Sequence, residues 1–325
     1  MSRREFVSAA IVAACVAGFL APAFVQAQAY PTKPITLISP FPPGVTGELL
    51  FRGLGESASK HLGQPVVIES RPGGSATLGP AAVAASKPDG YTVGQVTITA
   101  FRVPYMQKTS FDPVKDFTWI IHLGGYTLGA VVLADGPFKH WKDVIAFAKA
   151  NPGKFTYTTI GPATTNAIAM ELMARQSGVK FTHIPGKGGG EGIAAVLGKH
   201  VMMMVESPAW APMVAAGQFR LLMVLNGERS KKWPDTPTLK ELGYTYEFDS
   251  PFGLAGPKGM DPAIVKRLHD AFKLAYEDPK VIELFDKFDF TRRYMSTAAY
   301  AAFVPKLAAE EKAALEKLGL AKKDE

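Results

Sequence analysis

Short runs of β-branched and other apolar residues alternate along most of the chain with segments whose apolar residues recur every three or four positions. The short runs predict strands bounded by glycine and proline at Ile35–Ser39, Val66–Glu69, Thr92–Val96, Trp119–Leu123, Ala130–Ala134, Phe155–Thr159, Phe181–Ile184, Val201–Val205 and Leu221–Leu225. The helical spacings predict helices over 47–61, 76–86, 141–150, 165–177, 190–198 and 209–216. Alternation of this kind is typical of α/β proteins, so we expect two parallel, doubly wound sheets.

The C-terminal third has a different pattern and is predicted to be mostly helical. Asp261 is a favourable N-cap for a first helix, and Asp278 ends that helix and begins the next. Thr297 is expected to cap a last helix that runs to Leu318 and bends at Pro305. A chain of 325 residues is long enough for two domains, and we expect these helices to pack on the first one.

The first 29 residues have the pattern of a bacterial export signal. Arg3-Arg4 precedes an apolar run, and small residues then lead to expected cleavage sites at Ala27 or Ala29. Residues 2–7 also fit a twin-arginine signal, so the general secretory and twin-arginine routes both stay open. The single cysteine, Cys15, lies in this segment, so the mature chain is expected to have no disulfide or thiolate site. These features predict a soluble periplasmic protein with no spanning helix.

Charge and motif content narrow the class of function. The formal net charge of +7 is spread over short basic runs without interleaved aromatic residues, so we expect no nucleic-acid partner. The sequence contains no P-loop, HExxH, GxSxG or GxGxxG motif. Its six histidines are scattered without the spacing of metal ligands. We therefore expect no catalytic activity, no cofactor and no metal.

Two turns rich in glycine, proline and threonine connect a predicted strand to a predicted helix, over residues 40–48 and 158–166. In an open α/β sheet, ligands bind beyond the carboxyl ends of the strands, where free N–H groups and helix dipoles favour an anion. The turns, one in each expected domain, are thus predicted to close on one carboxylate from opposite sides. The alternative is that each turn only caps its own helix.

Seven short motifs resemble the Bug family, the periplasmic substrate-binding proteins of tripartite tricarboxylate transporters. They are Tyr30–Ile35, Pro40–Gly44, Gly63–Glu69, Arg71–Gly74, Pro88–Thr92, Phe111–Phe117 and Pro234–Thr238. The resemblance implies a type II periplasmic-binding-protein fold, with residues 30–128 and 249–325 in one domain and 129–248 in the other. Two crossover strands would join these domains around a cleft. The family also implies capture of a small carboxylate, delivery to a membrane permease, and no catalysis.

The resemblance places the ligand in the loops that match residues 41–48 and 159–166. Together with residues at neighbouring strand ends, the expected ligand-binding set is Phe41, Gly44, Val45, Thr46, Gly47, Glu48, Thr97, Arg102, Thr159, Gly161, Ala163, Thr164, Thr165 and Glu206. Several positions depart from the family pattern: Val45, Ala163 and Ala167 stand where glycine or histidine is usual, and Glu48 and Glu206 replace aspartate.

Three further residues have two interpretations each. Arg102 is either a fork for a second ligand carboxylate or a solvated surface arginine. Trp210 and Phe252 either line the cleft or pack in the core. We expect a monomer whose ligand is a dicarboxylate or an aromatic acid. The alternative function is a periplasmic sensor that docks onto a histidine kinase, because it needs the same closing cleft. An enzyme has the least support.

Overall fold

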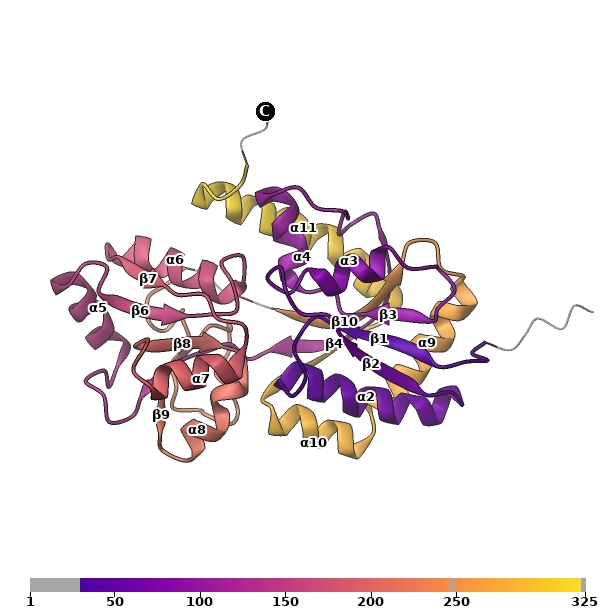
Figure 1. Cartoon of the computed structure of the whole chain (residues 1–325), viewed down its shortest axis with the longest axis horizontal. Helices are drawn as coiled ribbons and strands as arrows, with labels where there is room; N and C mark the ends of the chain where they lie inside the picture. Colours follow the sequence, from indigo (N-terminus) through magenta and orange to yellow (C-terminus); the bar gives the residue numbers. More distant parts are fainter. Residues whose placement is uncertain (1–29, 246–247, 249, 323–325) are drawn as a thin grey trace, which may run out of the picture.

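Two separate sheets organise the chain, and the computed structural model describes residues 30–245, 248 and 250–322 (Figure 1). The expected export signal and its cleavage sites lie outside the described residues. The larger sheet has the order β11-β4-β10-β3-β1-β2 and forms domain 1; the smaller has the order β7-β6-β8-β5-β9 and forms domain 2. The strands are β1 (Ile35–Ser39), β2 (Val66–Ser70), β3 (Thr92–Gly94), β4 (Phe117–Tyr126), β5 (Gly129–Leu133), β6 (Phe155–Thr158), β7 (Phe181–His183), β8 (Met203–Glu206), β9 (Phe219–Val224), β10 (Pro251–Pro257) and β11 (Phe290–Met295).

Both sheets are mixed, which corrects the expectation of purely parallel sheets. The β1–β2, β1–β3, β6–β7 and β6–β8 pairs are parallel. By contrast, β10 is antiparallel to β3 and β4, β5 is antiparallel to β8 and β9, and β11 is antiparallel to β4. The reversal at β5 and β10 follows from the topology, because the chain enters a domain from the other one on these two strands. They therefore run away from the interdomain region, whereas their neighbours run toward it.

Helices cover the faces of both sheets, which is the two-domain α/β arrangement expected from the sequence (Figure 1). Domain 1 carries α2 (Thr46–Leu62), α3 (Leu78–Ala84), α4 (Ile98–Met106), α9 (Pro262–Tyr276), α10 (Pro279–Lys287) and α11 (Thr297–Leu318). Domain 2 carries α5 (Trp141–Ala150), α6 (Thr165–Ser177), α7 (Gly189–Leu197), the 3₁₀ turn η1 (Pro208–Trp210) and α8 (Ala211–Ala215). Among the described helices, none combines the length and apolar character needed to cross a bilayer.

The sequence pattern does not predict α4, β10 or β11. Helix α4 is short and contains Pro104, which breaks the helical pattern. Strand β10 is buried at every position, so it shows no polar alternation, and most of the β11 residues are exposed. The N-cap of α11 is Ser296 rather than Thr297, since the Ser296 hydroxyl accepts the Ala299 N–H at 3.4 Å. The Thr297 hydroxyl instead donates to the Ile120 carbonyl at 2.6 Å.

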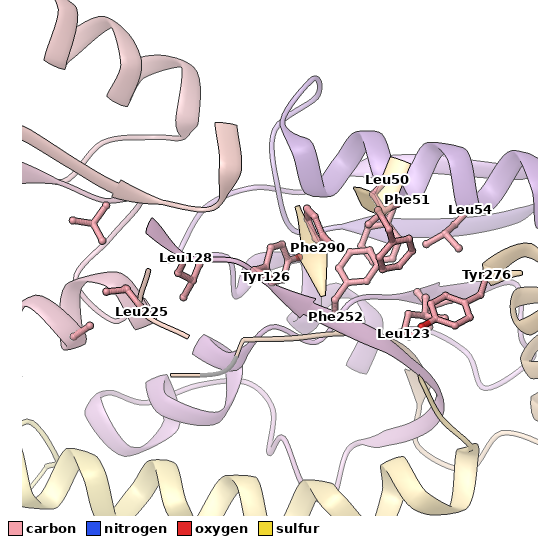
Figure 2. Packing of buried hydrophobic residues seen from close by; sticks show 14 of the residues in the cluster. Leu50, Phe51, Leu54, Leu123, Tyr126, Leu128, Leu225, Phe252, Tyr276 and Phe290 are labelled. Carbon is pink, nitrogen blue, oxygen red and sulfur yellow. The ribbon is translucent and has the colours of Figure 1, made fainter. Parts of the chain in front are cut away.

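An aromatic cluster fills the core between α2 and the larger sheet (Figure 2). Phe51 of α2 stacks on Phe252 of β10 with ring centroids 4.5 Å apart, and Tyr126 meets Phe252 edge-on at 5.6 Å. Phe252 is fully buried, so it packs in the core and does not line the cleft. Trp210 is also fully buried, and its indole N–H donates to the Glu206 carbonyl at 2.9 Å. Of the two interpretations of these aromatic residues, the structure shows core packing.

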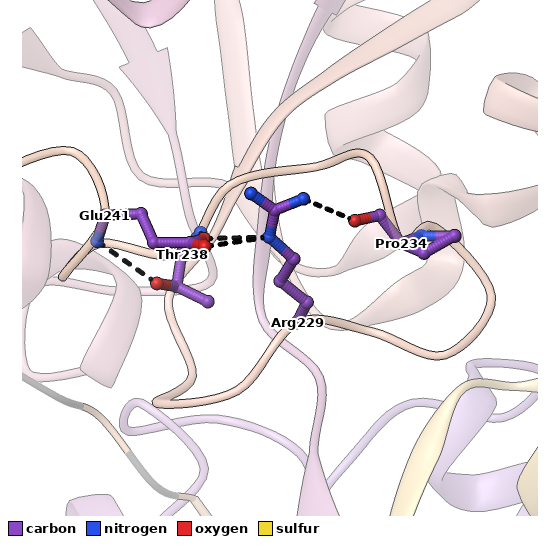
Figure 3. Close-up of polar contacts among 4 residues, drawn as sticks. All are labelled: Arg229, Pro234, Thr238 and Glu241. Carbon is purple, nitrogen blue, oxygen red and sulfur yellow. Dashed lines mark hydrogen bonds and ion pairs between the residues drawn. The ribbon is translucent and has the colours of Figure 1, made fainter.

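Two connections link the sheets, over residues 127–128 and 225–250. An arginine anchors the second connection (Figure 3): the Arg229 Nε donates to both carboxylate oxygens of Glu241 at 3.0 and 2.9 Å, and Nη1 donates to the Pro234 carbonyl at 2.6 Å. The Thr238 hydroxyl accepts the Glu241 N–H at 3.3 Å, which fixes the turn after the Pro234–Thr238 motif. The expected domain boundary at 248/249 includes Asp249, which lies outside the described residues.

Candidate functional site

A cleft lies between the two sheets, at the carboxyl ends of strands from both. It consists of two adjoining pockets of about 520 Å³ and about 50 Å³. The larger is lined from domain 1 by residues 40–42, 45, 47, 72–76 and 126, and from domain 2 by 160, 186–189, 206, 207 and 209. The smaller adds residues 97–99 and 164–166, so the N-termini of α2, α4, α6 and α7 all border the cleft. Each helix N-terminus contributes a partial positive charge, which favours an anion.

The expected ligand-binding residues fall into two groups. Those that line the pockets are Phe41, Val45, Gly47, Thr97, Thr164, Thr165 and Glu206. The other seven line neither pocket in the described part of the chain: they are Gly44, Thr46, Glu48, Arg102, Thr159, Gly161 and Ala163. The cleft thus brings together both predicted turns.

The first loop, between β1 and α2, is held by Glu48. Its Oε2 accepts the Gly44 N–H at 3.0 Å and its Oε1 accepts a hydrogen bond from Arg52, so this carboxylate closes the loop. Gly44 has φ +84°, which glycine adopts without strain, whereas Val45 is extended at φ −81°, which suits a β-branched residue. The N–H groups of Thr46 and Gly47 in the first turn have no acceptor among the described residues.

Threonines hold the second loop, between β6 and α6. The Thr164 hydroxyl caps α6, accepting the Ala167 N–H at 3.3 Å and donating to the Gly161 carbonyl at 2.8 Å. The Thr159 hydroxyl also reaches the Gly161 carbonyl, at 3.0 Å, and lies 2.9 Å from the His183 Nε2. Burial lowers the pKa of His183, which favours its neutral form. This loop therefore has a fixed shape and adds no charge to the cleft.

Two buried polar atoms at opposite sides of the cleft have no hydrogen-bond partner among the described residues. They are the Thr46 hydroxyl at the start of α2 and the Asn166 side-chain carbonyl at the start of α6. Their residues are 7% and 3% exposed, respectively. A buried polar atom without a partner destabilises the fold, so such atoms in a cleft indicate where a ligand completes the hydrogen bonding.

Arg102 adopts neither of its two expected arrangements. The side chain is 1% exposed, and its Nε and Nη2 donate to the Glu311 carboxylate, the Nη2 bond being 3.0 Å long. Its Nη1 donates to the Thr165 hydroxyl at 2.8 Å. The guanidinium is thus neither solvated nor turned into the pockets. It joins α4 and α11 of domain 1 to the first residue of α6 in domain 2.

Several residues that border the cleft were not predicted from the sequence. Ser75 and Ala76 line both pockets and have φ +54° and +66°, directly after the Pro72–Gly74 turn. That glycine-rich motif was the signal that could have located them, because it predicts unusual backbone conformations. Tyr126 gives no such signal. It borders the cleft because β4 ends there, and its hydroxyl accepts a hydrogen bond from the Gln95 Nε2 at 2.6 Å.

Comparison with known proteins identifies the family. Residues 50–320 match the model of TctC, described as the tripartite tricarboxylate transporter family receptor. The chain belongs to the TctC family. A relative from Cupriavidus necator, named "UPF0065 protein in gbd 5'region", is 47% identical over 99% of both chains. The expected resemblance to Bug proteins is confirmed.

Solved structures agree with this assignment. The periplasmic binding protein BugD superposes with a TM-score of 0.84 and 25% identity, covering 90% of this chain and 100% of its own. An R. palustris protein solved with adipate gives a TM-score of 0.83 and 26% identity, covering 90% and 99%. This TctC-family chain is therefore a periplasmic solute-binding protein with the expected two-domain fold, and its family consists of binding receptors.

Proposed function

We propose that this TctC-family receptor captures a small organic acid in the interdomain cleft and presents it to the membrane permease of a tripartite tricarboxylate transporter. In this proposal, residues 1–29 direct export and are removed near Ala27 or Ala29, and the mature chain acts as a monomer without catalysis. The ligand carboxylate lies between the N-termini of α2 and α6.

The unpaired polar atoms at these two helix ends are the observation that carries the proposal. Asn166 lines the smaller pocket from domain 2, and its side-chain amide can donate to a carboxylate through Nδ2. The buried Thr46 hydroxyl stands in domain 1 between the pocket-lining Val45 and Gly47, and the first N–H groups of both helices have no acceptor among the described residues. Because the groups come from both domains, a bound carboxylate favours the closed arrangement of the two domains. The adipate complex of the R. palustris protein supports an acidic ligand for this chain.

The sizes of the pockets fit such a ligand. The pocket of about 50 Å³ is bordered by Thr164, Thr165 and Asn166, and it has room for little more than one carboxylate or water molecule. The adjoining pocket of about 520 Å³ lies within the usual range for small-molecule sites and has space for the rest of the ligand.

Thermal unfolding of the ligand-stripped mature chain against a panel of organic acids tests the proposal. A ligand present at 100 times its Kd stabilises the folded state by about 2.7 kcal/mol, which raises the Tm measurably. Nucleotides are the control compounds. If no organic acid raises the Tm, the chain is not a carboxylate receptor. Uptake of the identified acid by cells with and without the chain then tests delivery to the permease.

A pair of isosteric variants separates binding from folding. Thr46→Val removes a hydroxyl that has no partner among the residues the structure describes, so we expect weaker ligand binding and unchanged or higher stability without ligand. Thr182→Val is the matched control on the far side of domain 2, where the hydroxyl donates to the Gly153 carbonyl at 2.7 Å. This control is expected to lower stability and leave the affinity unchanged. Unchanged affinity in Thr46→Val would argue against the proposed position of the carboxylate.

A further inference from the structure

Glu206 is the acidic side chain that borders both pockets of the cleft. It ends β8 and is 7% exposed. Its Oε1 accepts the Ser207 N–H at 2.9 Å and the Ser207 hydroxyl at 3.2 Å, while no described hydrogen bond reaches Oε2. Burial raises the pKa of Glu206 to about 7. The cleft thus contains a carboxyl group with one oxygen free to accept a hydrogen bond from a ligand.

No buried cation balances this carboxyl group among the described residues that line the pockets. The other ionisable side chains there are Lys187, which is exposed, and Tyr126, whose pKa is raised by burial. Arg102 is held by Glu311, so its charge is already paired. A second carboxylate on the ligand would therefore lie near Glu206 without a buried positive charge to compensate the repulsion.

Apolar side chains line the larger pocket, which Glu206 also borders. Phe41, Pro42 and Val45 come from domain 1, and Ile160 and Ala209 come from domain 2. The cleft therefore combines helix N-termini that favour an anion, an apolar lining and a hydrogen-bond acceptor. Each of these three features selects a different chemical group on the ligand.

We infer that the ligand is an organic acid with a single carboxylate and a separate hydroxyl or ammonium group that donates a hydrogen bond to Glu206. This inference rests on the proposed function and specifies the ligand class. A hydrogen bond to a charged group contributes more than one between neutral groups, and an acid without the donor leaves the Glu206 Oε2 unpaired. Glu206 thereby excludes doubly charged dicarboxylates and selects acids that bear a donor.

Two series of acids matched in length test the inference by calorimetry at pH 8, where Glu206 is ionised. The first is butyrate, 4-hydroxybutyrate, 4-aminobutyrate and succinate, and the second is the corresponding set built on hexanoate, ending in adipate. In at least one series, we expect the hydroxy or amino acid to bind at least about 10-fold more tightly than both the unsubstituted acid and the dicarboxylate. The better of the two donors distinguishes a hydroxyl from an ammonium ligand.

Glu206→Gln, which removes the negative charge and retains an acceptor, is expected to shift the preference toward the dicarboxylate by about 10-fold and to weaken binding of the amino acid most. Glu191→Gln is the matched control, since this exposed carboxylate accepts the Lys187 N–H at 2.6 Å and does not line the pockets. It should leave the ranking unchanged. Lowering the pH from 8 to 6 protonates Glu206 in the wild type, so the relative affinity for the dicarboxylate should rise, as it does in Glu206→Gln.

The outcomes separate the inference from the proposed function. Binding of succinate or adipate as tightly as the donor-bearing acids, or an unchanged ranking in Glu206→Gln, overturns the inference and leaves a carboxylate receptor. Absence of binding by every acid in both series overturns the proposed function and the inference together. The Tm of each variant confirms that it is folded under the assay conditions.

Discussion

Gly161 of domain 2 faces Ser75 of domain 1 across the cleft with no room for a side chain between them. A methyl group at position 161 would lie 2.4 Å from the Ser75 Oγ and 3.2 Å from its Cβ. Because the two residues belong to different domains, this collision exists only when the cleft is closed. We therefore predict that Gly161→Ala weakens ligand binding by opposing closure.

The magnitude has two separable parts. Gly161 has φ +156°, so alanine there is strained by about 1–3 kcal/mol in the open and closed states alike, and this part lowers the Tm without changing the affinity. The collision with Ser75 is an overpacking cost of about 1–3 kcal/mol that applies to the closed state alone. Such a difference between the two states weakens the apparent affinity by about 5- to 150-fold.

The assay combines calorimetry of ligand binding with the Tm of the ligand-free protein. Ser75→Gly is the compensating change, because it removes the colliding atoms at a residue whose φ of +54° glycine adopts readily. In the double variant we expect the affinity to return toward the wild-type value, while the strain at position 161 remains in the Tm. Wild-type affinity in Gly161→Ala, or a double variant that binds as weakly as Gly161→Ala, would refute the reasoning.

Three further predictions concern buried polar groups. Glu311→Ala leaves Arg102 buried without its ion pair and is expected to lower the free energy of unfolding in urea by about 3–5 kcal/mol. The control Glu171→Ala breaks an exposed ion pair and should lower it by less than about 1 kcal/mol. Equal losses of stability in the two variants would contradict this prediction. The folded-state pKa of Glu206 is about 7, above its ordinary 4.5, because burial favours the protonated carboxyl group. The contribution of this group to the stability of the fold is therefore complete below pH 4.5 and is lost as the pH rises through 7. Unfolding measured against pH should show the wild type losing about 3 kcal/mol relative to Glu206→Gln over that interval, and parallel curves would disprove it. Thr165→Val removes the acceptor for the Arg102 Nη1, so calorimetry should show ligand affinity weakened about 10-fold. Thr165→Ser keeps the hydroxyl and should bind the ligand with wild-type affinity. Weaker binding in both variants would assign the effect to packing.

Predictions from sequence succeeded where neighbouring residues determine the structure. Asp261 and Asp278 cap their helices as expected, with side chains that accept the N–H groups of Ala263 and Lys280 at 2.7 and 2.9 Å. The expected strands of both domains are present, with ends that differ by at most a few residues. The two loops that border the cleft also follow from local pattern, because a strand, a glycine-rich turn and a helix N-terminus are consecutive in the chain.

The sequence by itself therefore determined the α/β class, most of the elements, the family resemblance and the two loops that border the cleft. Only the tertiary structure decided what the side chains of the cleft do. Arg102 pairs with Glu311, Ser75 meets Gly161, and Glu206 is buried beside the loop that follows β1. Local periodicity carries no information on such contacts, because their partners are far apart in sequence and meet only after the chain has crossed between the domains. The charge balance of the cleft, and with it the chemistry of the ligand, depends on these distant contacts.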